Sequence, residues 1–424
     1  MVGCFSDSLY DLTLLQRNIG NNQMVGENIN QNAIKWLTYT MFFTFAMTTD
    51  AVGKIIPVII KEFGLSHTQA GAFHYVTMLG IALSGIFLGY LADKLGRKTA
   101  IMIGLLIYAV SCFLFAIGNT YTFFVLLLFS SGIAIGIFKS AGLALVGDIT
   151  HTSIEHTKSM NMVEGFFGIG AIVGPAIVTY LLANEFSWKY LYIFAGFICV
   201  LLSVATWRVK TPAVTHHASE PINLRRTFKM AKNGYALGFS LAIAFYVGTE
   251  AAIYVWMPTL LTKYDGDLIW LAGNALIIFF ILRAVGRFMA IWVLSKISWS
   301  SAMLIFSGAI FICYVLSMTL GLDYAVVLLP ATGLFMAMIY PTLNSKGISC
   351  FSKHEHGAVA GLILFFTAVA ATIGPLLMAV FSDLMGGEAR YGFYLATAFS
   401  GLLFIAMVYN SVKQPAAQQL ASFS

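Results

Sequence analysis

Ionisable side chains that interrupt long apolar segments are the residues of this sequence best suited to bind a solute or carry a proton. They are Asp50, Lys54, Lys139, Glu164, Glu250, Arg283 and Arg287. An ionisable group at the centre of a bilayer costs about 2.5–3.5 kcal/mol on insertion scales. A chain that keeps several must recover this free energy through ion pairs, a water-filled cavity or a function. The alternative for any single group is a buried structural ion pair.

Two carboxylic acids, Asp50 and Glu250, are the candidates for proton coupling. Asp50 has Lys54 one helical turn away as a possible partner, and Glu250 follows Tyr246-Val-Gly-Thr. A carboxyl group that is partly removed from water inside a cavity can load and release a proton near neutral pH. Both groups stand near the middle of an apolar segment, where proton coupling requires them.

The remaining candidates are side chains that could contact a solute. Lys139 could pair with Asp50 or bind an anionic group, whereas Glu164 stands close to one end of its segment. Aromatic faces beside polar groups suit a sugar ring and its hydroxyls. The predicted substrate-binding set is Lys139, Tyr246, Tyr254, Trp256, Arg283, Tyr340 and Asn344.

Twelve apolar segments hold these residues. Hydrophobic residues make up 59% of the 424 residues and charged residues 10%, and the mean hydropathy of +0.84 excludes a soluble domain of this size. About 20 apolar residues cross a bilayer as a helix, and lipid requires every backbone polar group to be paired within the protein. We therefore expect an all-α protein in the lipid bilayer. The spans are expected near 36–60, 70–91, 99–118, 121–147, 159–183, 188–207, 235–261, 269–293, 301–320, 325–348, 357–381 and 391–410.

Charge and cysteine usage argue against other classes. The net charge of +6 falls mostly in short loops, which indicates membrane topology rather than nucleic-acid binding. The five cysteines lack the spacing of metal ligands or of a disulfide framework. The sequence suggests no nucleophile–base pair, so we expect no enzyme activity, no metal and no cofactor.

Lys and Arg also predict the orientation and the domain organisation. They are concentrated in the loops of one side, which predicts that both termini are cytoplasmic. The longest polar connection is 208–234, the natural boundary between two halves. The expected order is an N-terminal tail without a signal-peptide pattern (1–35), a six-helix bundle (36–207), a linker (208–234), a second six-helix bundle (235–410) and a C-terminal tail (411–424).

The two halves share a repeated pattern. Gly374-Pro375 repeats Gly174-Pro175 at a separation of 200 residues (374 − 174), and Thr332-Gly333-Leu334 matches Ser131-Gly132-Ile133 at 201 (333 − 132). Two segments that repeat at nearly one spacing indicate a duplicated six-helix unit. Duplicated halves place a binding site near the midplane of the membrane, between them.

A charged turn between the second and third spans carries the most specific motif, Gly89-Tyr-Leu-Ala-Asp-Lys-Leu-Gly-Arg-Lys98. Small residues allow close helix approach, and basic residues fix a loop on the cytoplasmic side. The positions that carry the motif are Gly89, Asp93, Gly96, Arg97 and Lys98. Their spacing is stricter than charge bias requires, and the segment resembles the signature loop of the major facilitator superfamily.

The second half resembles the fucose:proton symporter branch of that superfamily. The similar stretches are Tyr246-Val-Gly-Thr-Glu250, Leu282-Arg-Ala-Val-Gly-Arg-Phe-Met-Ala290, Gly333-Leu-Phe-Met-Ala-Met-Ile-Tyr-Pro-Thr-Leu343 and the span that ends in Phe381-Ser-Asp383. One departure matters: Lys139 stands where the branch has a carboxylate, so the proton-carrying role of that position does not transfer. Asp50 also stands about one turn from the branch's first-span acid.

The resemblance implies twelve helices in two pseudo-symmetric bundles that rock about a central site. It also implies that Asp93, reinforced by Arg97, caps the helix that begins near His356 and so closes the cytoplasmic side. We expect a monomer in a bacterial inner membrane that transports a sugar or related polar solute together with protons. An organic-anion (carboxylate or uronate) symporter, a drug:proton antiporter and a non-transporting sensor are the alternatives, and charged residues at mid-membrane disfavour the sensor.

Overall fold

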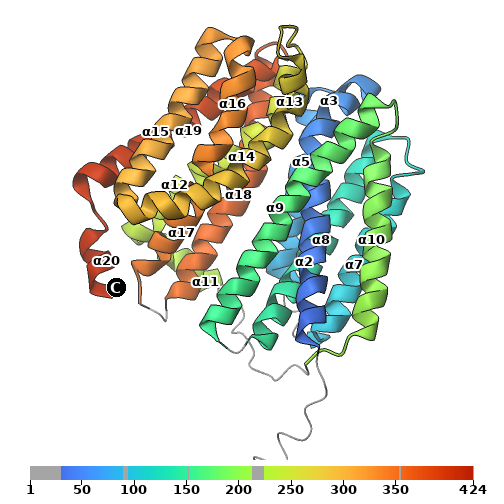
Figure 1. Cartoon of the computed structure of the whole chain (residues 1–424), viewed down its shortest axis with the longest axis horizontal. Helices are drawn as coiled ribbons and strands as arrows, with labels where there is room; N and C mark the ends of the chain where they lie inside the picture. The colour runs from blue at the N-terminus through green and yellow to red at the C-terminus, as the bar shows by residue number, and fades with distance from the viewer. Residues whose placement is uncertain (1–29, 89–93, 151, 213–223, 353–354, 424) are drawn as a thin grey trace, which may run out of the picture.

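Helices make up the regular structure of the residues that the computed structural model describes: 30–88, 94–150, 152–212, 224–352 and 355–423 (Figure 1). Eleven of the helical segments are long and apolar enough to cross a membrane. The remaining span is the second along the chain. Its helix α5 runs for 16 residues and ends at Phe87, close to residues 89–93, which lie outside the described ranges. The predicted all-α membrane fold with twelve spans in two bundles is confirmed.

The first bundle contains the helices coloured blue to green in Figure 1. Their bounds are α2 (Gln31–Thr49) with α3 (Val52–Phe63), α4 (His67–Ala70) with α5 (Ala72–Phe87), α7 (Arg97–Leu114), α8 (Tyr121–Ile149), α9 (Ser153–Ala183) and α10 (Lys189–Arg208). In this bundle α8 packs against α5 and α7, α2 packs against α9, and α10 packs against α7.

The second bundle contains the yellow to red helices. Their bounds are α12 (Gly234–Ala251), the π-helix η1 (Ala252–Trp256) and α13 (Met257–Leu261), then α14 (Ile269–Lys296), α15 (Trp299–Leu320), α16 (Leu322–Met336) with α17 (Ile339–Ser349), α18 (His356–Leu384) and α19 (Ala389–Lys413). Short helices α11 (Leu224–Met230) and α20 (Ala417–Phe423) complete it. Residues 213–223 of the expected linker lie outside the described residues, so the domain boundaries stay predictions.

The repeated glycines make equivalent contacts in the two bundles. A Cβ atom on Gly132 would lie 2.3 Å from the Thr77 carbonyl oxygen, and one on Gly333 would lie 2.3 Å from the Phe279 carbonyl oxygen. Thr77 and Phe279 are themselves 202 residues apart (279 − 77). Each bundle therefore brings two helix backbones together at the same place, as small residues do in membrane proteins.

The first and seventh spans are irregular at equivalent positions. The first span is interrupted between α2 and α3 at Asp50 and Ala51. The seventh changes from α-helix to π-helix at Ala252, which is 201 residues after Ala51 (252 − 51). Local π-helix is frequent at functional sites, and interrupted helices line the binding sites of many transporters. Both irregular points lie where the two bundles meet, because α3 packs against η1 and α13.

We name the two ends of the molecule by the chain termini. The start of α2 and the end of α20 lie at the bottom of Figure 1, and we call this end the terminal face. The opposite end, which includes Phe63, His67, Leu261 and Leu384, we call the far face. In Figure 1 the two bundles lie close together at the far face, where α3 and α13 meet.

Candidate functional site

A buried carboxylate in the second bundle anchors the candidate site. The Glu250 side chain on α12 is 9% exposed, and its Oε1 lies 2.8 Å from Nη2 of Arg283 on α14. The hydroxyl of Tyr246, one turn earlier on α12, lies 2.8 Å from the same Oε1 and 3.0 Å from the carbonyl oxygen of Met336. A buried carboxylate needs this kind of pairing, because leaving it unpaired costs several kcal/mol. The sequence analysis listed Glu250 as a proton-coupling candidate and Tyr246 and Arg283 as solute contacts, and in the structure these three side chains are in contact with one another.

The first bundle contributes Asp50 and Lys139 to the same region. Asp50 Oδ2 accepts a hydrogen bond of 3.3 Å from Thr49, and the charges that act on Asp50 include Arg283, Glu250 and Lys139. The Lys139 ammonium lies 5.1 Å from the centroid of the Phe45 ring, within the range of a cation–π contact. Neither Asp50 nor Lys139 forms an ion pair within the described part of the chain.

The proposed pairing of Asp50 with Lys54 is not found. The chain is interrupted at Asp50, so the two residues do not share one regular helix. Lys54 instead donates through Nζ to the carbonyl oxygen of Gly273 on α14. This contact joins the two bundles on the far-face side of Asp50.

A second pair extends the charged group toward the terminal face. Arg287, one turn after Arg283 on α14, lies 3.8 Å from the carboxylate of Glu164 on α9. The exposed fraction of the side chains rises in order along this group, from 9% for Glu250 and 22% for Arg283 to 40% for Arg287 and 56% for Glu164. The group is therefore reached from the terminal face. It holds three anions and three cations, which are Asp50, Glu164, Glu250, Lys139, Arg283 and Arg287; we call these six residues the central charge cluster.

Contacts between the bundles cover the cluster on the far-face side. The ring of Trp256 on η1 lies against the ring of His67 on α4, with centroids 5.7 Å apart. The backbone of Tyr254 lies so close to Gly53 that a Cβ atom there would be 2.0 Å from the Tyr254 carbonyl oxygen. The Trp256 side chain is buried where the two bundles meet on this side of the cluster. A solute contact for Tyr254 or Trp256 stays a prediction.

Two further candidates lie beside the cluster on the second bundle. The rings of Tyr340 and Tyr246 have centroids 6.4 Å apart. Asn344 is one turn after Tyr340 on α17 and is partly buried. Their roles in binding stay predictions, although α17 places both on one side of the helix.

Two residues at the far face were not predicted as functional. The Asp383 carboxylate at the end of α18 accepts hydrogen bonds from the backbone N–H groups of His67 (2.9 Å) and Thr68 (2.8 Å) at the start of α4. His74 on α5 is 1% exposed, and its Nε2 lies 3.1 Å from the carbonyl oxygen of Ala371 on α18. Both contacts link the bundles. The sequence analysis noted Asp383 at the end of the eleventh span, but no sequence pattern predicts its contact with the start of α4.

The signature turn is only partly described. Gly89 and Asp93 lie outside the described residues, so the predicted cap of α18 by Asp93 stays a prediction. Gly96 has φ +87°, which only glycine adopts readily. Arg97 Nε donates to Asp148 on α8 at 3.1 Å, and Lys98 Nζ donates to the carbonyl oxygens of Trp207 and Val209. These contacts tie the turn to its own bundle.

A cavity of about 370 Å³ lies at the far face. Basic residues from both bundles line it, namely Lys61 and His67 from the first and Lys263 and Arg390 from the second. Glu388 lies in the same cavity and forms a 3.1 Å ion pair with Lys263. Within the described residues, no group of three or more His, Cys, Asp or Glu side chains could hold a metal ion.

Comparisons with known proteins agree with this architecture. Among curated proteins, the chain is 22% identical over 392 residues to a "Protein TsgA homolog" of Buchnera aphidicola subsp. Schizaphis graminum, covering 91% of this chain and 96% of that protein. Among solved structures, the nucleoside transporter NupG superposes with a TM-score of 0.70 at 16% identity, covering 89% of this chain and 97% of NupG. The Escherichia coli fucose:proton symporter FucP superposes with a TM-score of 0.61 at 21% identity, covering 89% of this chain and 98% of FucP.

A family model assigns the chain directly. The model described as "Major Facilitator Superfamily" matches residues 38–375, which include the second to the tenth span and most of the first and the eleventh. The match covers well over half of the sequence and contains the signature turn and the whole central charge cluster. The chain therefore belongs to the Major Facilitator Superfamily, and it is a multi-pass membrane transporter rather than an enzyme.

Proposed function

We propose that this transporter takes up a sugar or a related small polar solute together with protons, by alternating access to the central charge cluster. The observation that carries the proposal is the Glu250 carboxylate, which is bound by Arg283 and Tyr246 beside an Asp50 that lacks an ion pair in the described structure. Such a pair of acids offers one carboxylate that stays charged and one that can take up a proton.

The two acids have different roles in this proposal. Asp50 carries the proton, because the interruption of the first span leaves its carboxyl group at the point where the bundles meet. Glu250 holds Arg283 in place and releases it to the solute or to Asp50 as the bundles move. Tyr246 supplies a hydroxyl and an aromatic face to the solute. The fold shared with a fucose:proton symporter and a nucleoside transporter supports a small polar solute and does not identify it.

An organic anion is the second candidate, and one observation favours it. The central charge cluster has three anions and three cations, so it is neutral when all six groups are charged. A proton on Asp50 would leave one positive charge unbalanced, and Lys139 has no anionic partner within ion-pair distance among the described residues. A carboxylate or uronate would restore the balance.

A ligand screen separates these two candidates. A solute at about 100 times its dissociation constant stabilises the folded protein by about 2.7 kcal/mol, which raises its unfolding temperature. Purified transporter should be screened by thermal unfolding against neutral sugars, nucleosides, uronates, carboxylates and amino acids. Stabilisation by sugars alone supports the first candidate, and stabilisation by carboxylates that requires Lys139 supports the second.

Transport by two variants tests the coupling itself. Reconstituted Asp50→Asn and Glu250→Gln proteins should be measured for solute accumulation driven by a pH gradient and for exchange of solute at equal pH. Asp50→Asn is expected to keep exchange and to lose accumulation, because exchange needs no net proton movement. The matched control is Glu388→Gln at the exposed far face, which should keep both activities. If both cluster variants accumulate solute normally, proton coupling by these acids is wrong.

A further inference from the structure

The far-face cavity has a volume of about 370 Å³ and is built from both bundles. Its lining residues come from α3 and the start of α4 in the first bundle, and from α13, α15, α16 and α19 in the second. Figure 1 shows the meeting of α3 and α13 at this face. A space with walls from both bundles keeps this form only while the far face is closed.

The contact of Gly53 with Tyr254 separates this cavity from the central charge cluster. Along the first span the order is Asp50 in the cluster, Gly53 in the contact, and Lys61 in the cavity. The side chain of Lys263, which also lines the cavity, is 64% exposed, so the cavity opens at the far face. It is therefore distinct from the site that is reached from the terminal face.

The cavity carries an excess of positive charge. Glu388 neutralises Lys263 through their 3.1 Å ion pair. Lys61 and Arg390 form no ion pair within the described part of the chain. Arg390 donates one 3.2 Å hydrogen bond to the carbonyl oxygen of Met318, which uses one of the five N–H donors of a guanidinium. Two cations from opposite bundles thus line one space without an anionic partner from the described chain.

A buried hydroxyl at this cavity also lacks a partner. Thr259 is 8% exposed and lines the cavity, and its Oγ1 has no hydrogen-bond partner among the described residues. Leaving such a group unpaired costs free energy, so proteins pair nearly all of them with protein, water or ligand atoms. Apolar side chains complete the lining, among them Ile60, Leu260 and Leu322. Apolar walls beside a few polar groups are typical of sites for small organic molecules.

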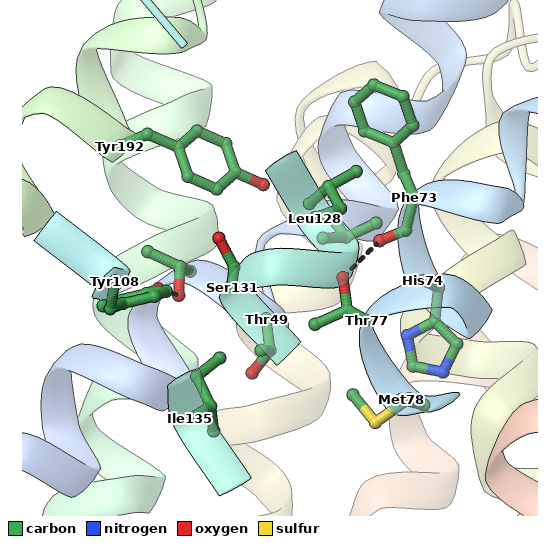
Figure 2. Close-up of a pocket in the computed structure, with 12 residues that line it drawn as sticks. Thr49, Phe73, His74, Thr77, Met78, Tyr108, Leu128, Ser131, Ile135 and Tyr192 are labelled. Atoms are coloured by element: carbon green, nitrogen blue, oxygen red, sulfur yellow. Dashed lines mark hydrogen bonds between the residues drawn. The ribbon is translucent and has the colours of Figure 1, made fainter. Parts of the chain in front are cut away.

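The small cavity inside the first bundle has none of these properties. Its volume of about 10 Å³ is at the lower limit of about 10–15 Å³ for a single water molecule. Figure 2 shows Phe73, Leu128 and Ile135 among the side chains around it, and its lining residues include no Lys, Arg, Asp or Glu. It offers neither the space nor the charge to bind a solute.

We propose that the far-face cavity binds a small organic anion, and that the bound anion holds the far face closed. The acidic group of the anion pairs with Arg390, whose planar guanidinium matches a carboxylate, and with Lys61 of the other bundle. Its body lies against the apolar walls, and the Thr259 hydroxyl donates to it. A ligand that binds only the closed arrangement shifts the population of the protein toward that arrangement. Proton coupling by Asp50 is not required for this binding.

Calorimetric titration of the purified protein tests the preference for an anion. The ligands are succinate and benzoate, with their neutral amides succinamide and benzamide as matched controls. We expect the acids to bind at least about tenfold more tightly than their amides. Arg390→Gln and Lys61→Gln should each weaken binding of the acid about tenfold, and Thr259→Val should weaken it about threefold.

Lys189→Gln is the matched control for these variants. Lys189 is also a lysine of the far face, but it does not line the cavity, and its Nζ donates to the carbonyl oxygen of Gly118. This variant should bind the acids as the parent does. Acids that bind no more tightly than their amides would overturn the proposed site, and so would parental affinity in both Arg390→Gln and Lys61→Gln.

The dependence on closure needs a separate variant. Gly53→Ala keeps the two bundles apart at the far face, so it should weaken binding of the anion at least about tenfold. Gly168→Ala, which has nothing within 4 Å of its Cβ position, should bind as the parent does. Parental affinity in Gly53→Ala would show that the anion does not hold the far face closed.

A variant of the central charge cluster separates this site from the proposed function. Lys139→Gln should keep the parental affinity for the anion, because the cluster and the cavity lie on opposite sides of the contact between Gly53 and Tyr254. Loss of binding in Lys139→Gln would assign the anion to the central charge cluster and overturn the far-face site. Failure of proton coupling by Asp50 would overturn the proposed function and leave the far-face site as it is.

Discussion

At the scale of single residues, this transporter keeps costly charges by pairing most of them across helices. Glu250 and Arg283 form the most buried ion pair of the central charge cluster. Arg287 and Glu164 form the more exposed one. An exposed ion pair contributes little, whereas losing one partner of a buried pair leaves an uncompensated charge. The two pairs should therefore respond differently to the same kind of substitution.

The pair of Glu250 and Arg283 gives a stability prediction. Arg283→Leu should lower the free energy of unfolding by about 3–5 kcal/mol, because it leaves the Glu250 carboxylate buried without its cation. The double variant Glu250→Gln with Arg283→Leu should recover a large part of this loss, because no charge then remains unpaired. Thermal unfolding in detergent measures both. Arg287→Leu is the matched control, with an expected effect within about 1 kcal/mol. Equal losses in the single and double variants would contradict the prediction.

At the scale of elements, contacts at helix ends and at interrupted helices hold the far face closed. Asp383 of α18 binds two backbone N–H groups at the start of α4, as a capping carboxylate does. Gly53 of α3 lies against the backbone of η1. Each contact joins an element of one bundle to an element of the other. Both must break when the far face opens.

The cap on α4 gives a prediction about conformational balance. Asp383→Ala removes a cap that contributes about 1 kcal/mol, which corresponds to about a fivefold change in the ratio of open to closed far face. The rate of labelling of a cysteine introduced by Thr259→Cys, a lining position of the far-face cavity, should rise accordingly. Glu388→Gln in the same background removes an exposed ion pair within one bundle and should leave the rate unchanged. An unchanged labelling rate in Asp383→Ala would show that this cap does not hold the far face closed.

The contact at Gly53 gives a steric prediction. Gly53→Ala places a methyl group where the Tyr254 carbonyl oxygen lies, so the far face cannot close fully. Solute uptake should fall at least tenfold, since this contact is backbone to backbone and cannot relax through a rotamer change. Gly168→Ala is the control, because nothing lies within 4 Å of its Cβ position. Parental uptake by Gly53→Ala would show that closure does not need this contact.

At the scale of the whole molecule, the class of solute decides how much charge crosses the membrane with each proton in the proposed cycle. Three acids and three bases from two bundles lie at the meeting point of the halves. A neutral solute that travels with one proton carries one positive charge across, whereas a monovalent anion that travels with one proton carries none. The electrical signature of transport therefore reports the class of solute.

This difference gives a prediction for reconstituted membranes. Addition of a transported sugar to transporter on a solid-supported membrane should produce a transient current, and Asp50→Asn should abolish it. A transported monovalent carboxylate should produce uptake without current. Accumulation of a sugar that is driven by a pH gradient but produces no current would contradict coupling to one proton per sugar.

The sequence predicted the whole molecule better than its contacts. The twelve spans and the two halves follow from local patterns of apolar residues and charge, whereas the contact of Glu250 with Arg283 does not. The cap of α4 by Asp383 does not, because its two ends are separated by more than 300 residues and by no detectable pattern. The predicted pairing of Lys54 with Asp50 is wrong, because the interruption at Asp50 turns the following helix so that Lys54 reaches Gly273 instead. His74 carried no signal beyond being a polar residue in an apolar span.

The contact between Gly53 and Tyr254 also bears on how the molecule arose. Met47 and Gly248 are equivalent positions of the first and seventh spans, because Gly174 packs on Met47 and its repeat Gly374 packs on Gly248. They are 201 residues apart (248 − 47), and so are Gly53 and Tyr254 (254 − 53), which makes Gly53 and Tyr254 counterparts in the duplication. In a two-fold symmetric assembly, a residue that touches its own counterpart lies on the symmetry axis. An assembly of two identical copies would have one amino acid on both sides there, and a residue with a Cβ atom at the Gly53 position meets the opposite backbone. A single chain that contains both copies can place glycine on one side and tyrosine on the other, as this chain does.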